Sequence, residues 1–140
     1  ADVAGAYFPG FTAEDANKDI GDSAIMETGG IGGMAIATAP AIVRFLGAGR
    51  YQDAVNYTNS MYEITLSEQD QYAMPDLDFR GSPIGIDILK VVETGIAPII
   101  NTAIACKRPG VGMIGAGISK APLAMFEEAM VAFAEAHGLQ

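Results

Sequence analysis

Three of the eight basic residues of this chain flank one glycine-rich segment, between residues 107 and 120. Glycines leave backbone amides open to an anion, and neighbouring cations add positive charge. The pattern predicts a cradle for a phosphate or a carboxylate. Lysines and arginines beside a turn are also common on solvated surfaces, and this alternative stays open. The cradle would be formed by Lys107, Arg108, Gly112, Gly115, Gly117 and Lys120.

Residues 110–115 spell Gly-Val-Gly-Met-Ile-Gly, the spacing of a dinucleotide-binding loop. That fingerprint needs a helix directly behind the third glycine. Here the expected helix begins only at Pro122, several residues later. We therefore predict no dinucleotide cofactor.

A second group of polar residues lies just before four glycines at positions 29–33. Asp22, Ser23, Glu27 and Thr28 could bind a substrate amide, accept a proton or hold a metal ion. The free amides at the start of the following helix would point toward the same place. Hydrogen bonds in turns and caps explain these residue types equally well. We predict no metal site and no cofactor.

Other common catalytic patterns are missing from the sequence. It contains no His-Glu-x-x-His and no Gly-x-Ser-x-Gly motif, and Cys106 and His137 are single. His137 ends an expected helix, where a cation is favourable without any catalytic role. Cys106 is interpreted as an inert thiol, with a reactive thiol beside Lys107 as the alternative.

The elements that must position these residues follow from the helical and strand periodicities. We expect an α+β fold, with a mixed sheet, packed helices and a C-terminal amphipathic helix whose apolar face contains Leu123, Phe126, Met130 and Phe133. The expected elements are a strand over 6–11, a helical turn after Thr12, a helix over 34–46 divided at Pro40, a helix over 51–65, an extended piece over 71–74, a polar connection over 76–81, a helix over 88–94 between Asp87 and Gly95, a strand over 96–105, a glycine-rich strand or loop over 111–118, and a helix from Pro122 to Gly138.

Composition and charge exclude several classes of function. Half of the 140 residues are hydrophobic, and the formal net charge is −9. Such a chain fits one folded α+β domain over 1–140 and repels nucleic acids and anionic lipid surfaces. The apolar stretch over 31–46 is too short and too interrupted to span a bilayer. With one cysteine and no recognisable secretion signal, the expected location is the cytoplasm.

Six strings of this sequence form a recognisable set: Phe11-Thr-Ala-Glu-Asp-Ala-Asn17, Gly21-Asp-Ser-Ala-Ile-Met-Glu-Thr28, Gly30-Ile-Gly-Gly33, Val91-Val-Glu-Thr-Gly-Ile96, Pro98-Ile-Ile-Asn-Thr102 and Ile114-Gly-Ala-Gly117. With these strings the chain resembles one bacterial family from about Tyr7 to Gly138. The family includes a subunit of the oxamate carbamoyltransferase of anaerobic allantoin breakdown. Its members are roughly three times as long, and the resemblance implies that this chain corresponds to their C-terminal portion.

The resemblance implies the phosphorolysis of a carbamoylated oxamate to oxamate and carbamoyl phosphate, performed with other subunits as part of a homo- or hetero-oligomer. Such a reaction needs a cradle for phosphate, donors for a carboxylate and hydrogen bonds to a developing oxyanion. The residues that the resemblance places at such a site are Asp22, Ser23, Glu27, Thr28, Glu93, Thr94, Asn101, Thr102, Lys107 and the loop from Gly112 to Gly117.

The chain departs from the family pattern at three positions. Where the family has Thr-Gly-Ile-Ala-His-Lys, this chain has Ala103 and Cys106 in place of the glycine and the histidine, and Met113 replaces a glutamine. Losing an imidazole removes a proton shuttle that works near neutral pH. Two hypotheses remain: a component of a carbamoyltransferase-like enzyme that acts on small anions, or a non-catalytic domain that packs against the missing N-terminal portion or partner subunits.

Overall fold

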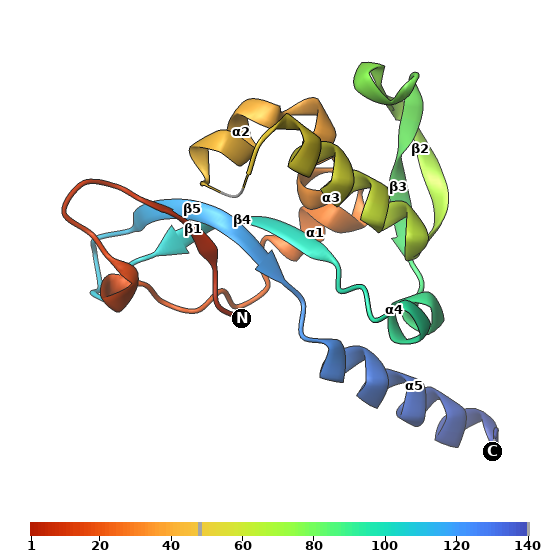
Figure 1. Cartoon of the computed structure of the whole chain (residues 1–140). Coiled ribbons are helices and arrows are strands. Elements are labelled where there is room, and N and C mark those ends of the chain that lie inside the picture. Colours follow the sequence, from red (N-terminus) through yellow and green to blue (C-terminus); the bar gives the residue numbers. More distant parts are fainter. Residues whose placement is uncertain (48, 140) are drawn as a thin grey trace.

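The computed structural model describes residues 1–47 and 49–139, and it confirms the predicted α+β class (Figure 1). Five strands and several helices alternate without a regular βαβ rhythm. In chain order the elements are β1 (Ala4–Tyr7), η1 (Ala13–Asp15), α1 (Ala24–Thr28), η2 (Gly32–Thr38), α2 (Pro40–Phe45), α3 (Tyr51–Glu63), β2 (Thr65–Met74), η3 (Pro75–Leu77), β3 (Arg80–Ile86), α4 (Ile88–Thr94), β4 (Ile99–Ala105), β5 (Met113–Lys120) and α5 (Leu123–His137).

The strands form a three-stranded sheet in the order β1-β5-β4 and a separate two-stranded sheet of β2 and β3. All of these strand pairs are antiparallel, so the sheet is simpler than the mixed one expected. For two of the pairs the reason is the length of the connections: short turns join β2 to β3 and β4 to β5, whereas a parallel pair needs a crossover of a dozen residues or more. The long connection between β1 and β5 does not set the direction of that pair.

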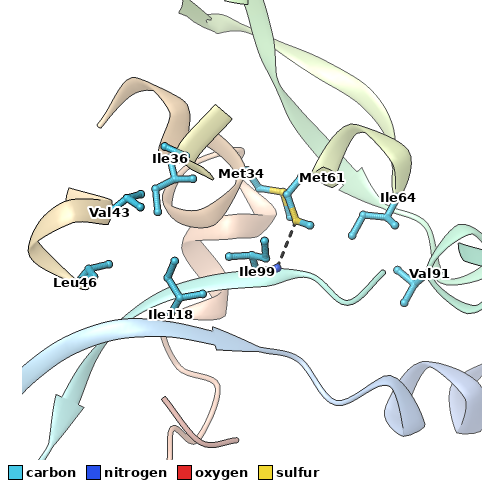
Figure 2. Close-up of a cluster of buried hydrophobic side chains, with 10 residues drawn as sticks. Met34, Ile36, Val43, Leu46, Met61, Ile64, Val91, Ile99 and Ile118 are labelled. Atoms are coloured by element: carbon cyan, nitrogen blue, oxygen red, sulfur yellow. Dashed lines mark hydrogen bonds between the residues drawn. The ribbon is translucent and has the colours of Figure 1, made fainter. Parts of the chain in front are cut away.

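The hydrophobic core lies between the three-stranded sheet and the helices that cover one of its faces. Figure 2 shows side chains from η2, α2 and α3 pointing toward Ile99 of β4 and Ile118 of β5. The Ile99 amide also donates to Met61 Sδ at 3.3 Å. The cluster comprises Met34, Ile36, Val43, Leu46, Ala54, Met61, Ile64, Val91, Ile99 and Ile118.

Local signals predicted most helix boundaries correctly. Pro40 begins α2 and separates it from η2, because proline fits the first turn of a helix but not its interior. Asp87 caps α4 by accepting from the Leu89 amide at 2.9 Å, and Gly95 ends it in the left-handed conformation.

The hairpin of β2 and β3 was predicted incompletely. We expected an extended piece over 71–74 and a polar connection over 76–81, whereas the structure has strands over 65–74 and 80–86. The first strand is polar and largely exposed, so its hydrophobic signal is weak. Pairing with the second strand supplies the backbone hydrogen bonds that stabilise it. Accordingly α3 ends at Glu63, two residues earlier than predicted.

The C-terminal helix was predicted correctly between Pro122 and Gly138, but only part of its apolar face is covered. Leu123 and Phe126 pack against the core, whereas the Phe133 side chain is 56% exposed. Among the residues described, no helix combines the length and the apolar character needed to cross a membrane.

Candidate functional site

Several polar residues hydrogen-bond to the free edge of β4. In the order β1-β5-β4, only one side of β4 pairs with a strand among the residues that the structure describes. Its other edge bonds to side chains and loops: the Asn101 amide donates to Glu27 Oε1 at 2.9 Å, and the Ala105 carbonyl accepts from the Asn17 amide at 2.8 Å. In an antiparallel ladder every second residue directs both backbone groups to the same side. Ala103, halfway between Asn101 and Ala105, therefore presents its amide to this edge.

Glu27, in α1, links this helix and the glycines at 29–33 to β4. Its side chain is 1% exposed, and Oε1 also accepts from the Gly33 amide at 2.8 Å. Gly32, at φ +65°, lies against this carboxylate, because a Cβ built there would be 2.1 Å from Oε1. Glu27 Oε2 has no hydrogen-bond partner among the described residues. Two predicted residues, Glu27 and Asn101, are thus brought together as a buried bridge.

A second contact between α1 and β4 joins two more predicted residues. The Ser23 and Thr102 hydroxyl oxygens are 2.8 Å apart and form a hydrogen bond. Asp22 lies beside them on the surface, and its Oδ1 accepts from the Ser23 amide at 3.0 Å. Ser23 and Thr102 therefore hold the start of α1 against the strand.

These residues open into a surface hollow of about 220 Å³, which we call the β4-edge hollow. It offers a lysine side chain and the edge amide of Ala103 as donors, with two carboxylates beside them. The hydroxyl groups of Ser23 and Thr102 bond to each other, and Thr102 also donates to the Ala103 carbonyl at 3.3 Å. Donors of this kind can bind a carboxylate, a phosphate or a carbonyl oxygen. The hollow is lined by Asn17, Lys18, Asp19, Ile20, Asp22, Ser23, Thr102, Ala103 and Ala105.

The cations of the predicted anion cradle do not meet in this chain. Lys120 pairs in register with Ile99, at the start of β4, whereas Lys107 and Arg108 follow the end of that strand. A strand of seven residues spans roughly 20 Å, so the two groups lie at opposite ends of the sheet. Lys107 Nζ donates instead to the Glu14 carbonyl at 2.9 Å.

The glycines of the predicted cradle have a packing role. Gly115 and Gly117 lie in β5, the central strand, whose amides face a partner strand on both sides. A Cβ on Gly115 would be 2.3 Å from the Ala6 carbonyl oxygen, so β1 could not approach as it does. Gly112 closes the hairpin, with its carbonyl accepting from the Cys106 amide at 2.9 Å.

The remaining predicted residues lie outside the hollow. The Thr28 hydroxyl donates to the Ile25 carbonyl at 2.6 Å, within its own helix. Glu93 is exposed on α4, which packs mainly against α5, and the neighbouring Thr94 hydroxyl donates to the Lys90 carbonyl at 2.7 Å. Within residues 1–47 and 49–139 no group of three or more His, Cys, Asp or Glu side chains could hold a metal ion.

Sequence reasoning missed Lys18 and Asp19, which line the hollow. Asp19 Oδ1 accepts from the Gly21 amide at 2.6 Å, which shapes the loop between η1 and α1. The signal available was their position between the strings ending at Asn17 and beginning at Gly21.

Fold and site together define an α+β structure with a small polar hollow at a sheet edge. No family model matches the chain. It is 52% identical, over 96% of its length, to the oxamate carbamoyltransferase subunit AllG of Escherichia coli (strain K12). It is also 52% identical, over 98% of its length, to YahG of the same strain. The predicted resemblance to the family of this carbamoyltransferase subunit is thus confirmed over nearly the whole chain.

The match is to part of longer proteins. The chain spans 32% of the length of AllG and 29% of that of YahG. A crystal structure of a conserved protein of unknown function from Enterococcus faecalis V583 superposes with a TM-score of 0.88 at 54% identity, and the match covers 94% of this chain and 31% of that one. The same fold therefore occurs within a polypeptide about three times as long.

Proposed function

We propose that this chain is a region of a carbamoyltransferase-like enzyme that acts on small anions of the oxamate and carbamoyl phosphate type. The identity of 52% to a subunit of oxamate carbamoyltransferase supports this proposal most strongly. The β4-edge hollow also supports it, because three residues predicted at the site, Asp22, Ser23 and Thr102, line it. The activity would belong to the complete assembly, with partner subunits.

In this proposal the hollow binds the anionic end of a substrate. Lys18 supplies a positive charge in a chain of net charge −9, and the Ala103 amide supplies a hydrogen bond. The bonded hydroxyl groups of Ser23 and Thr102 hold the wall of the hollow in place. Positioning and electrostatic stabilisation can accelerate acyl transfer without a covalent intermediate. Glu27 and Asn101 act as positioning residues, because their bond fixes α1 against the strand.

The reaction would be the phosphorolysis of a carbamoylated oxamate. A phosphate oxygen forms a bond to the carbamoyl carbon, and the bond from that carbon to the oxamate nitrogen breaks. The proton that hydrogen phosphate gives up goes to this nitrogen, which leaves oxamate and carbamoyl phosphate. Negative charge builds on the carbamoyl oxygen during the attack, and donors such as the Ala103 amide would stabilise it.

The proposal is tested by ligand-dependent thermal stability of the complete assembly. A ligand that binds only the folded state adds about 2.7 kcal/mol at a concentration of 100 Kd. We expect phosphate, carbamoyl phosphate or oxamate to raise the melting temperature. Lys18→Gln and Ser23→Ala should remove this shift, whereas Lys107→Gln, at the hairpin turn, should retain it.

Three outcomes separate the alternatives. If none of the three ligands shifts the melting temperature, the proposal is abandoned. If Lys107→Gln removes the shift and Lys18→Gln retains it, the anion site lies at the hairpin turn instead. Ala103→Gly, which restores the family residue at the hollow, should change the preference among the ligands if this position selects the substrate.

A second candidate function is that of a non-catalytic assembly domain. The observation in its favour is the C-terminal helix, whose apolar side chains are largely exposed. In that case Lys18→Gln and Ser23→Ala would leave the turnover of the complete enzyme intact. A loss of turnover, with assembly unchanged, favours the catalytic proposal.

A further inference from the structure

The C-terminal helix α5 projects away from the rest of the molecule (Figure 1). It has 15 residues, and the structure gives none of them as buried. Its main neighbour is the short helix α4, and near its start Leu123 and Phe126 pack against the core. The greater part of α5 is thus held by few contacts within the described residues.

A second stripe of apolar side chains lies beside this contact face on α5, and Phe133, seven residues after Phe126, joins the two. Its members recur at i, i+4, i+7, i+8 and i+11, so they lie on one face of the helix. Within this stripe Met125 is 54% exposed and Phe133 is 56% exposed. The stripe consists of Met125, Ala129, Ala132, Phe133 and Ala136. A helix whose apolar residues cover more than half of its circumference is typical of a position buried inside a larger protein.

The charges on α5 restrict what can cover this stripe. Glu127, Glu128 and Glu135 share the remaining side of the helix, and residues 121–139 contain no Lys or Arg. A second copy packed through α5 would bring these glutamates toward three more, with no Lys or Arg on either helix to pair with them. Like charges at close range are destabilising. A partner surface rimmed with Lys or Arg would be favoured instead.

The lengths of the relatives indicate where such a surface could come from. The match to AllG extends over 135 residues, so it includes most of α5, yet this chain spans only 32% of that protein. We propose that the Met125–Phe133 stripe docks on an apolar surface rimmed with Lys or Arg in the polypeptide that corresponds to the other two thirds of these relatives. This inference does not depend on what the β4-edge hollow binds.

The test is site-specific photo-cross-linking in the full-length protein or complex as it occurs in its host. A photoreactive amino acid is placed at Ala132, in the stripe, or at Val131, which is 59% exposed on the side of the glutamates. The two positions are adjacent on the same helix but face different directions. We expect position 132 to cross-link to peptides outside the 140 residues, and position 131 to give little product.

Mixed isotope labelling distinguishes a link between two copies of this chain from a link to another segment. Links from position 132 to a second copy, equal yields from positions 131 and 132, or no product from position 132 would each overturn the proposal. A second measurement uses the double variant Met125→Gln and Phe133→Gln, which should weaken the association about tenfold or more. Val131→Gln serves as its control and should leave the association unchanged.

Discussion

Replacing Gly32 with alanine should break the buried bridge between α1 and β4. The Cβ of the new residue would lie 2.1 Å from Glu27 Oε1 and 2.8 Å from Glu27 Cδ, well inside van der Waals contact. The methyl group and the carboxylate cannot occupy these places together. The carboxylate must therefore move away from the Gly33 and Asn101 amides, to which it bonds at 2.8 Å and 2.9 Å.

The size of the effect follows from two contributions. Alanine in the left-handed region costs about 1–2 kcal/mol. Each hydrogen bond to a charged group contributes about 1.5–3 kcal/mol, so the loss of both adds about 3–6 kcal/mol. Gly32→Ala should thus lower the free energy of unfolding by several kcal/mol, a large part of the roughly 5–15 kcal/mol available to a domain.

Gly47 provides a matched control for the backbone contribution. It has the same φ of +65°, and a Cβ built there meets no described atom within 4 Å. Gly47→Ala should therefore cost only about 1–2 kcal/mol. Urea unfolding of both variants, with unchanged m-values, measures the difference. If Gly32→Ala is no more destabilising than Gly47→Ala, the Glu27 bridge does not contribute as argued.

A double-mutant cycle with Glu27→Ala identifies the carboxylate as the cause. That substitution removes the acceptor and leaves the same two amides unpaired. Once it is gone, adding Gly32→Ala should cost only the backbone strain. The coupling energy between the two positions should reach at least about 2 kcal/mol, and strict additivity would contradict the proposed contact.

Further predictions concern sites away from the hollow. Thr58→Val should cost about 1–3 kcal/mol in urea unfolding, because the buried Thr58 hydroxyl accepts from the Ala37 amide at 3.0 Å. Burial raises the pKa of Tyr62; nearby Arg80 lowers it and Glu68 raises it, with a net upward shift. A raised folded-state pKa means that stability is full below about pH 10 and declines as the pH rises through the folded-state pKa. Tyr62→Phe should remove this decline in unfolding measured against pH. Arg80→Gln breaks the 2.7 Å ion pair with Glu68, and its cost should stay below about 1 kcal/mol because both side chains are well exposed.

Sequence reasoning predicted most of the helices, because their signals lie within a few residues, but it did not predict the short helix α1. Asp87 and Gly95 mark the two ends of α4, and Pro40 marks the start of α2. The β2–β3 hairpin was harder, because a polar strand such as β2 is stabilised by its partner rather than by its own pattern. The resemblance to the carbamoyltransferase subunit was also available from sequence, and the comparison with AllG confirms it.

For the site, the sequence supplied candidates but not their grouping. The expected cradle around Lys107 and Lys120 rested on glycines and cations that are close in sequence. In the structure β5 is the central strand of its sheet. The carbonyl groups of β1 occupy the space that side chains on Gly115 and Gly117 would need, so these glycines permit strand packing. An open amide and a close backbone contact both require a missing Cβ, so the residue type alone cannot separate them.

Composition and local pattern alone thus determined an acidic α+β chain with capped helices and an apolar C-terminal helix. Tertiary structure decided which polar residues meet. Ser23 and Thr102 are 79 positions apart, and Glu27 and Asn101 are 74 apart, yet each pair forms a hydrogen bond. Such contacts depend on α1 docking on the free edge of β4, and that edge exists only once three strands have paired in a particular order.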